Sequence, residues 1–169
     1  MPKKKKTVYR DAAEIVIAFL FAWFFYQGLA FALGTPLPVV SVVSDSMFHG
    51  TDFERWWSSN NDYYISNGIS KRDFVSFPFA NGLSQGDMLV IVRPDSIKLG
   101  DVVIYQRADA RYTIIHRVVA VSDEGYVIKG DSNAKEDPGF IKKEQILGKA
   151  VIVTPLLGYP RIALFALGV

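Results

Sequence analysis

The sequence predicts a mainly β protein, in which an N-terminal transmembrane helix precedes an antiparallel β domain that carries a long inserted loop. Three observations support this fold class. Residues 15–44 carry no charge, a cluster of lysines precedes them, and several short β-branched runs separated by turn formers follow them. The 169 residues suggest one domain, long enough to bury a sizeable core.

The N-terminal apolar run is long enough to span a membrane. Its most hydrophobic part, residues 12–33, has 22 residues, and a helix of about 20 apolar residues crosses a bilayer core of roughly 30 Å. The residues before it are basic, and Lys and Arg favour the cytosolic side of a membrane. We therefore expect a cytosolic tail over residues 1–11, an anchor in the cell membrane over 12–33, and an extracytoplasmic domain over 35–169.

A cleavable secretory signal is the competing interpretation of the same run. The basic start, the apolar core and the small residues Ala30 and Ala32 are typical of such a signal. Against it, the 22 residues exceed the usual apolar core of about 7–15 residues. The four aromatic residues at 23–26 are also unusual for a signal core. Under both interpretations the rest of the chain lies beyond a membrane.

The composition argues against several classes of protein. From Thr35 onward there are 14 Lys and Arg against 15 Asp and Glu, so a basic face for nucleic acid is not expected. Without cysteine the chain has no disulfides and no cysteine nucleophile. A zinc site is unfavourable with two histidines 67 residues apart. The loop from Asp131 has Glu136 where a calcium loop needs glycine. We expect no metal and no cofactor.

The region after the apolar run has the pattern of a β domain. Pro36 and Pro38 cannot continue a helix, and the chain then changes to β-branched runs bounded by Gly and Asp. Because no amphipathic segment of helical length separates these runs, we expect a mainly antiparallel sheet. The predicted strands are residues 39–43, 88–93, 102–106, 112–121, 126–129 and 149–154.

Two segments fall outside this pattern. Residues 48–86 are long, polar and rich in aromatic side chains. We expect a surface insertion with its own hydrophobic cluster, and the alternative is a lid or a contact with the membrane surface, where Trp and Tyr are enriched. Residues 155–169 are apolar but interrupted by Pro160 and Arg161. A docked strand and the start of a second anchor are the two interpretations of this stretch.

Ser46 is the first candidate catalytic residue. It follows a predicted strand, so its hydroxyl can lie at the strand tip, beside a backbone edge that an extended peptide can pair with. By itself, the Ser-x-Ser-Met pattern at residues 44–47 is a weak signal and favours an ordinary turn at the end of a strand.

His116 is the candidate base, with Asp131 and Asp137 as its candidate partners. The histidine falls among β-branched neighbours in a predicted strand, and an imidazole can exchange a proton near neutral pH. Either aspartate, both in a following loop, can orient an imidazole. The simpler interpretations are a core histidine and a solvated turn.

Taken together and in order, these residues resemble the type I signal peptidases, in particular the archaeal and endoplasmic-reticulum branch. The bacterial branch has a lysine base where this sequence has His116. The resemblance covers residues 12–160 apart from 48–86. After the apolar run, the matching motifs are Ser44-Asp45-Ser46-Met47, Gly86-Asp87, Gly100-Asp101-Val102-Val103, Ile115-His116-Arg117 and Gly130-Asp131-x-Asn133-x-x-x-Asp137.

The resemblance implies a role for each site residue. Ser46 would be the nucleophile, and His116 the general base and later the general acid. Asp137 would orient the imidazole and Asp131 would support the site, although the sequence leaves open which of the two contacts His116. The oxyanion would be bound by the Ser44 side chain and the backbone N–H of Ser46.

The resemblance also implies an activity. The chain would be a membrane-anchored serine endopeptidase that removes signal peptides from secreted preproteins after small residues, through an acyl-enzyme. Its partners would be preproteins and membrane lipid, with the secretion translocon as a further candidate. One departure is that the family places a proline two residues after the methionine of the serine motif. This chain has His49 there, followed by the insertion, which makes His49 a rival base.

Two other functions remain as alternatives. The self-cleaving repressor group uses a Ser–Lys pair, for which Lys98 and Lys129 are the lysines to test, but a membrane anchor argues against it. The second alternative is a non-catalytic, membrane-anchored β domain that binds a partner through the aromatic segment 48–86.

Overall fold

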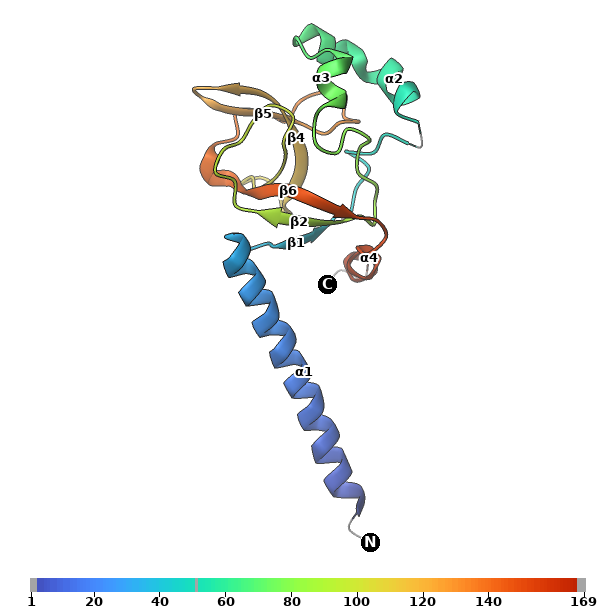
Figure 1. Ribbon diagram of the computed structural model, residues 1–169, viewed down its shortest axis with the longest axis vertical. Helices are drawn as coiled ribbons and strands as arrows, with labels where there is room; N and C mark the ends of the chain where they lie inside the picture. Colours follow the sequence, from blue (N-terminus) through green and yellow to red (C-terminus); the bar gives the residue numbers. More distant parts are fainter. Residues whose placement is uncertain (1–2, 51, 167–169) are drawn as a thin grey trace.

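The computed structural model describes residues 3–50 and 52–166, and its first element is a long helix that projects from the β domain (Figure 1). This helix, α1 (Lys3–Leu33), begins nine residues before the predicted start, so most of the basic tail is helical. It ends at Gly34, whose φ of 65° lies in the left-handed region that favours glycine, and Pro36 prevents its continuation. The hydroxyl of Thr35 donates to the carbonyl of Leu147 at 2.8 Å, which ties the end of the helix to the sheet.

The part of α1 from Val8 to Leu33 is long and apolar enough to cross a membrane. Its length and its composition are the features that meet this requirement. No side chain in the most apolar window of this stretch is buried, and its contacts with the β domain are confined to its C-terminal end, where the N–H of Arg93 donates to the carbonyl of Leu33 at 2.9 Å. A long apolar helix with exposed side chains is consistent with a membrane anchor.

The β domain is a single curled sheet of six strands, and every neighbouring pair is antiparallel. The strand order is β1-β2-β6-β3-β4-β5, which places β1 at one edge and β5 at the other. The sheet confirms the predicted antiparallel β class, with strands that differ from the predicted bounds by a few residues at their ends. The strands are β1 (Val39–Ser41), β2 (Met88–Val92), β3 (Val102–Tyr105), β4 (Ile114–Ser122), β5 (Gly125–Lys129) and β6 (Ile146–Thr154).

Strand β3 is the centre of the core. All four of its side chains are fully buried, and they alternate between two hydrophobic clusters. Val102 and Ile104 belong to one cluster, with Met47 and Leu89, while Tyr105 belongs to the other. This burial on both sides gives the strand next to it, β4, a rigid support.

The insertion contains two helices, so the expectation of a β domain interrupted by a long loop is wrong for this segment. Helix α2 (Phe53–Ser66) is capped by the Asp52 side chain, and α3 (Lys71–Val75) begins with a capping box between Ser70 and Asp73. The expected separate hydrophobic cluster is confirmed, and it packs on Val119 of β4. Its buried members from the insertion are Trp56, Trp57, Tyr64, Ile69 and Phe74.

The C-terminal segment is also helical, and the alternative of a docked strand is wrong. Helix α4 (Tyr159–Ala166) contacts β1. Pro160 is tolerated because it lies in the first turn, where a backbone N–H has no partner within the helix. A short 3-10 turn, η1 (Lys143–Gln145), precedes β6.

Candidate active site

Ser46 lies in the turn after β1, between two fixed points. Its backbone carbonyl accepts from the N–H of Ser132 at 2.9 Å, and the following residue, Met47, is only 1% exposed. The sulfur of Met47 also accepts from the N–H of Asp131 at 3.4 Å. The Ser-Met pair therefore has a physical basis, since the buried methionine anchors the turn that presents the serine.

His116 comes from β4 and meets Asp137, which answers the question left open between the two aspartates. The Nδ1 of His116 lies 2.6 Å from Oδ2 of Asp137. A carboxylate oxygen accepts, so Nδ1 donates the proton, and Nε2 is left to exchange protons with a substrate or a nucleophile. The backbone N–H of Asp137 donates to the carbonyl of Ile128 at 2.7 Å, which holds the loop against the sheet.

The same carboxylate oxygen accepts a second hydrogen bond, from Tyr105 at 2.6 Å. Burial alone would raise the pKa of Asp137, but the hydrogen bond and charge of His116, helped by Tyr105, hold that pKa below its usual value. Burial and the carboxylate together raise the pKa of the Tyr105 phenol, which therefore stays a donor. Sequence reasoning missed Tyr105; its only signal is its position at the end of the strand that begins with the Gly-Asp-Val-Val motif.

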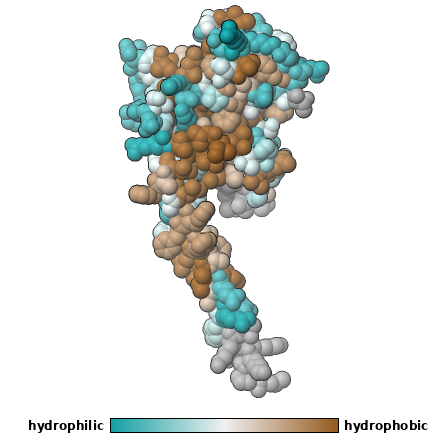
Figure 2. Space-filling view, viewed as in Figure 1, coloured by the Kyte–Doolittle hydropathy of each residue, from teal (hydrophilic) through white to brown (hydrophobic). Residues whose placement is uncertain are grey.

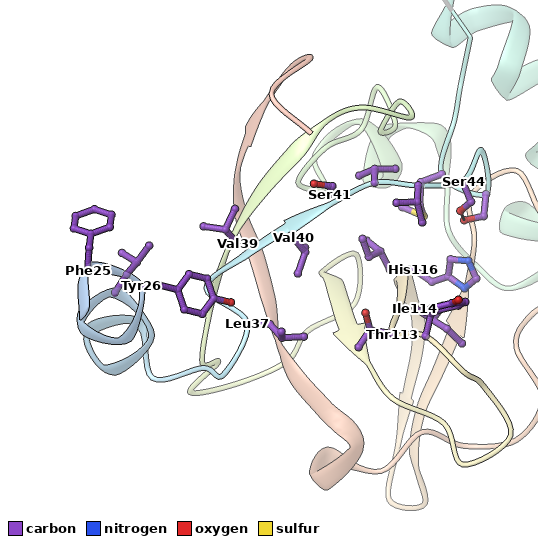
Figure 3. A pocket seen from close by; sticks show the side chains of 17 residues that line it. Phe25, Tyr26, Leu37, Val39, Val40, Ser41, Ser44, Thr113, Ile114 and His116 are labelled. Carbon is purple, nitrogen blue, oxygen red and sulfur yellow. Dashed lines mark hydrogen bonds between the residues drawn. The ribbon is translucent and has the colours of Figure 1, made fainter. Parts of the chain in front are cut away.

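Ser46 and His116 line one cavity of about 680 Å³ (Figure 3). The hydroxyls of Ser44 and Ser46 lie 3.1 Å apart, and Figure 3 shows Ser44 and His116 at the same end of the cavity. Within the described residues, the hydroxyl of Ser46 bonds to Ser44 and not to His116. Catalytic hydrogen bonds are often loose without substrate and tighten when it binds, so this geometry suits a site without substrate.

The cavity extends as an apolar groove away from the two serines. One wall is the segment from Leu37 to Val43, which includes the edge strand β1, and the opposite wall is residues 112–115 at the start of β4. The far end reaches α1 at Phe25 and Tyr26 (Figure 3). An edge strand beside a groove can pair with an extended peptide.

Asp131 has different partners from Asp137. Its side chain is fully buried. Its two carboxylate oxygens accept hydrogen bonds from Nε and Nη2 of Arg117, at 2.9 and 2.7 Å. Nε2 of His49 lies 2.9 Å from Oδ2 of the same carboxylate. Burial raises the pKa of Asp131, but Arg117 and His49 outweigh burial and lower it to about 2. The guanidinium also donates to the carbonyls of Pro78, Phe79 and Gly100. The ion pair of Arg117 and Asp131 therefore connects the insertion, through the carbonyls of Pro78 and Phe79, to strand β4.

The rival base His49 lies beside the buried Arg117–Asp131 pair, with its Nε2 2.9 Å from Asp131. Its ring stacks on Trp56, with 3.6 Å between ring centroids and 8° between planes, and the residue is 5% exposed. The residues that line the cavity with Ser46 include His116, and His49 is outside that set in the described chain. The geometry thus places His116, and not His49, in the cavity that Ser46 lines.

The two lysines of the Ser–Lys alternative also lie elsewhere. Lys129 is buried, and its ammonium donates to the carbonyls of Gly130 and Asp131 and to the hydroxyl of Tyr64. Burial lowers the pKa of Lys129 to about 8. Lys98 is exposed. In the described residues neither lysine lines the cavity that holds Ser46.

Gly130 in the Gly-Asp-x-Asn motif permits a close approach to the histidine. A Cβ at this position would lie 2.8 Å from Nε2 of His116 and 2.6 Å from the side-chain amide of Asn133. A side chain at position 130 would therefore displace the nitrogen that exchanges protons. Across residues 3–50 and 52–166, no group of three or more His, Asp or Glu side chains is arranged to hold a metal ion.

Comparisons with known proteins do not assign a family. No protein-family model matches the sequence. No curated protein matches it either.

Proposed function

We propose that the chain is a membrane-anchored serine endopeptidase that removes N-terminal signal peptides from secreted preproteins after small residues. The observation that carries this proposal is the placement of Ser46 and the His116–Asp137 pair at one end of a groove that leads to α1. A hydroxyl, a proton acceptor and a carboxylate that orients it are the parts that serine proteases share across unrelated folds.

The reaction has two halves. Ser46 Oγ attacks the scissile carbonyl carbon, and His116 Nε2 takes the hydroxyl proton while Asp137 stabilises the imidazolium. His116 then gives that proton to the departing amine, which is the new N-terminus of the mature protein. A water molecule, deprotonated by His116, attacks the acyl-enzyme ester and releases the signal peptide with a free carboxylate. The proton returns to Ser46.

The oxyanion of each tetrahedral intermediate needs donors. The backbone N–H of Ser46 and the hydroxyl of Ser44, which already lies 3.1 Å from the nucleophile, are the residues we assign to this task. Removal of one such donor typically raises a barrier by about 2.7–4 kcal/mol.

The groove supports an extended peptide as the proposed substrate. A peptide that pairs with the edge of β1 is extended, and its backbone is fixed relative to Ser46. The groove reaches the last part of α1. A peptide that emerges from the bilayer beside this helix would therefore meet Ser46 at a constant distance from the membrane surface. In this topology the N-terminus is cytosolic, the catalytic domain is extracytoplasmic, and lipid and the translocon are neighbours.

The non-catalytic alternative is less well supported. It requires the aromatic rings of residues 48–86 to be available to a partner, but Trp56, Trp57, Tyr64 and Phe74 are buried in their own cluster. A partner would therefore have to bind a different surface.

The test is cleavage of a labelled preprotein by the full chain in detergent, with Ser46→Ala as the critical variant. Ser58→Ala is the matched control, because Ser58 lies on α2 and its hydroxyl donates only to the Arg55 carbonyl in the described structure. We expect a cut after a small residue in the native chain and the control, and none with Ser46→Ala. Equal cleavage by Ser46→Ala would exclude Ser46 as the nucleophile, and an inactive, folded native chain would contradict the proposed activity.

A further inference from the structure

We propose that a second, polar cavity binds the first residues of the mature segment, which is the part of the preprotein after the cut, and favours a basic side chain there. The inference rests on the proposed peptidase function, and it gives the insertion a role in that function. The cavity has a volume of about 300 Å³ and lies between α2 and the loop after β5. Its polar side chains include Asn60 and Asp62 from α2, and Ser132 and Asn133 from the loop.

This polar cavity adjoins the two residues that would react with the substrate. The backbone N–H of Ser132 donates to the carbonyl of Ser46 at 2.9 Å. Nε2 of His116 and Nδ2 of Asn133 lie 2.8 and 2.6 Å from the same point, which a Cβ on Gly130 would occupy. Because His116 gives its proton to the departing amine, the first mature residue has to lie beside His116. That residue is therefore also close to Asn133, which lines the polar cavity.

The two cavities extend from the site toward opposite ends of the domain. The apolar groove leads from Ser46 to Phe25 and Tyr26 of α1, whereas the polar cavity is bounded by α2. Figure 1 shows α1 and α2 at opposite ends of the β domain. A peptide whose signal segment occupies the groove would continue past Ser46 in the direction away from α1. Since an extended chain advances about 3.3–3.6 Å per residue, its first few mature residues would reach the polar cavity.

The surface of the domain suits the two parts of such a substrate. Figure 2 shows hydrophilic surface gathered at the end away from α1, with apolar surface nearer to that helix. An apolar signal segment would therefore lie along the apolar part of the domain. The mature segment would leave across the hydrophilic end, toward water.

The charge that faces the polar cavity is negative. Asp62 is exposed, and its carboxylate has no hydrogen bond or ion pair within the described chain. Glu136 accepts from the hydroxyl of Tyr63, another lining residue, at 2.7 Å, which adds a second carboxylate beside the cavity. Among the described lining residues the one cation is Lys129, which is buried and donates to the carbonyls of the two residues that follow it. The cavity therefore attracts a basic side chain and repels an acidic one.

The experiment varies the charge of the substrate and the charge of the cavity together. A labelled preprotein carries Lys, Gln or Glu at each of its first few mature positions in turn, and kcat/KM is measured with the full chain in detergent. Asp62→Asn removes the charge of the cavity rim and Asp62→Lys reverses it. Asp123→Lys is the matched control, because Asp123 is an exposed aspartate in the turn between β4 and β5 and lies outside the cavity lining in the described chain.

At the position that enters the cavity, we expect the native chain to cleave the Lys substrate about two- to fivefold faster than the Gln substrate, the range of one exposed ion pair. The Glu substrate should be slower than the Gln substrate. Asp62→Asn should weaken this preference and Asp62→Lys should reverse it, whereas Asp123→Lys should keep the native order.

Two kinds of failure can be told apart. Equal rates for the three substrates at every position, or the same preference in all variants, would overturn the proposed cavity and leave the peptidase function standing. A folded native chain that cleaves none of the substrates would contradict the peptidase function, and the inference would fall with it.

Discussion

The imidazole Nδ1 of His116 lies 2.6 Å from the carboxylate Oδ2 of Asp137, although 21 residues separate them. This contact fixes which ring nitrogen carries the proton, and it leaves Nε2 as the nitrogen that can exchange a proton in the cavity that Ser46 also lines. The arrangement depends on the central strand β3, because β3 supplies Tyr105 to the same carboxylate and pairs with β4 beside His116.

Replacing the carboxylate should remove activity without removing the fold. In Asp137→Asn the amide would donate to His116 and hold the wrong tautomer, and in a comparable triad that change lowers kcat about 10⁴-fold. We expect a similar loss of kcat with little change in KM, measured by steady-state cleavage of a fluorogenic peptide. Asp109→Asn, an exposed carboxylate paired with Arg107, is the control. A loss confined to KM would contradict the positioning role of Asp137.

Tyr105→Phe removes one donor to the same carboxylate and leaves the ring in place. A hydrogen bond to a charged group contributes about 1.5–3 kcal/mol, part of which acts through His116, so we expect kcat to fall about tenfold. The pKa of Asp137 should rise, since the Tyr105 bond lowers it. Single-turnover kinetics and a carboxyl titration by NMR check the two effects. An unchanged kcat together with an unchanged pKa would show that Tyr105 only packs.

Replacing His116 should remove activity, whereas replacing His49 should mainly lower stability. His116→Ala removes the proton acceptor, so cleavage should disappear at every pH. His49→Gln keeps a donor near Asp131 and should retain most activity at the cost of stability, because the stack on Trp56 is lost. Activity and urea unfolding, both in detergent, distinguish the two variants. Equal loss of activity in both would contradict the assignment of the base.

The free energy of unfolding should depend on pH through the carboxylate of Asp131. Its folded pKa of about 2 lies below its ordinary value of 3.8, so the stabilisation is complete above about pH 4 and is lost as the pH falls through 2. The shift corresponds to about 2 kcal/mol. In Asp131→Asn the free energy of unfolding should be lower at pH 7 and should change less between pH 4 and 2. Denaturant titrations at several pH values measure this, and an equal slope in both proteins would contradict the assigned pKa shift.

The sheet could be predicted because its strands are short β-branched runs between glycines and aspartates, a local signal. Helix α2 could not be predicted in the same way, since its Trp and Tyr residues have modest helix propensity and a single aspartate such as its Asp52 cap is also common in turns. The C-terminal helix could not be predicted from the same local signals, because Pro160 interrupts an apolar run in the sequence and yet lies in the first turn of α4 in the structure.

The site shows the same division between local and long-range information. Ser46, His116 and Asp137 belong to motifs that can be read along the chain, and the structure places two of them in one cavity and the third against His116. The hydrogen bond of Tyr105 to Asp137 and the burial of His49 against Trp56 arise from packing between distant segments, which no local pattern encodes.

The central claim is that Ser46 forms an acyl-enzyme, and partitioning with a second nucleophile tests it most directly. Hydroxylamine added during cleavage of a preprotein should compete with water for the ester, so part of the released signal peptide should end in a hydroxamate. Mass spectrometry of that fragment measures the fraction, which should rise with hydroxylamine concentration and vanish with the cleavage itself in Ser46→Ala. A fragment that always ends in a carboxylate, or a hydroxamate that persists in Ser46→Ala, would contradict the account.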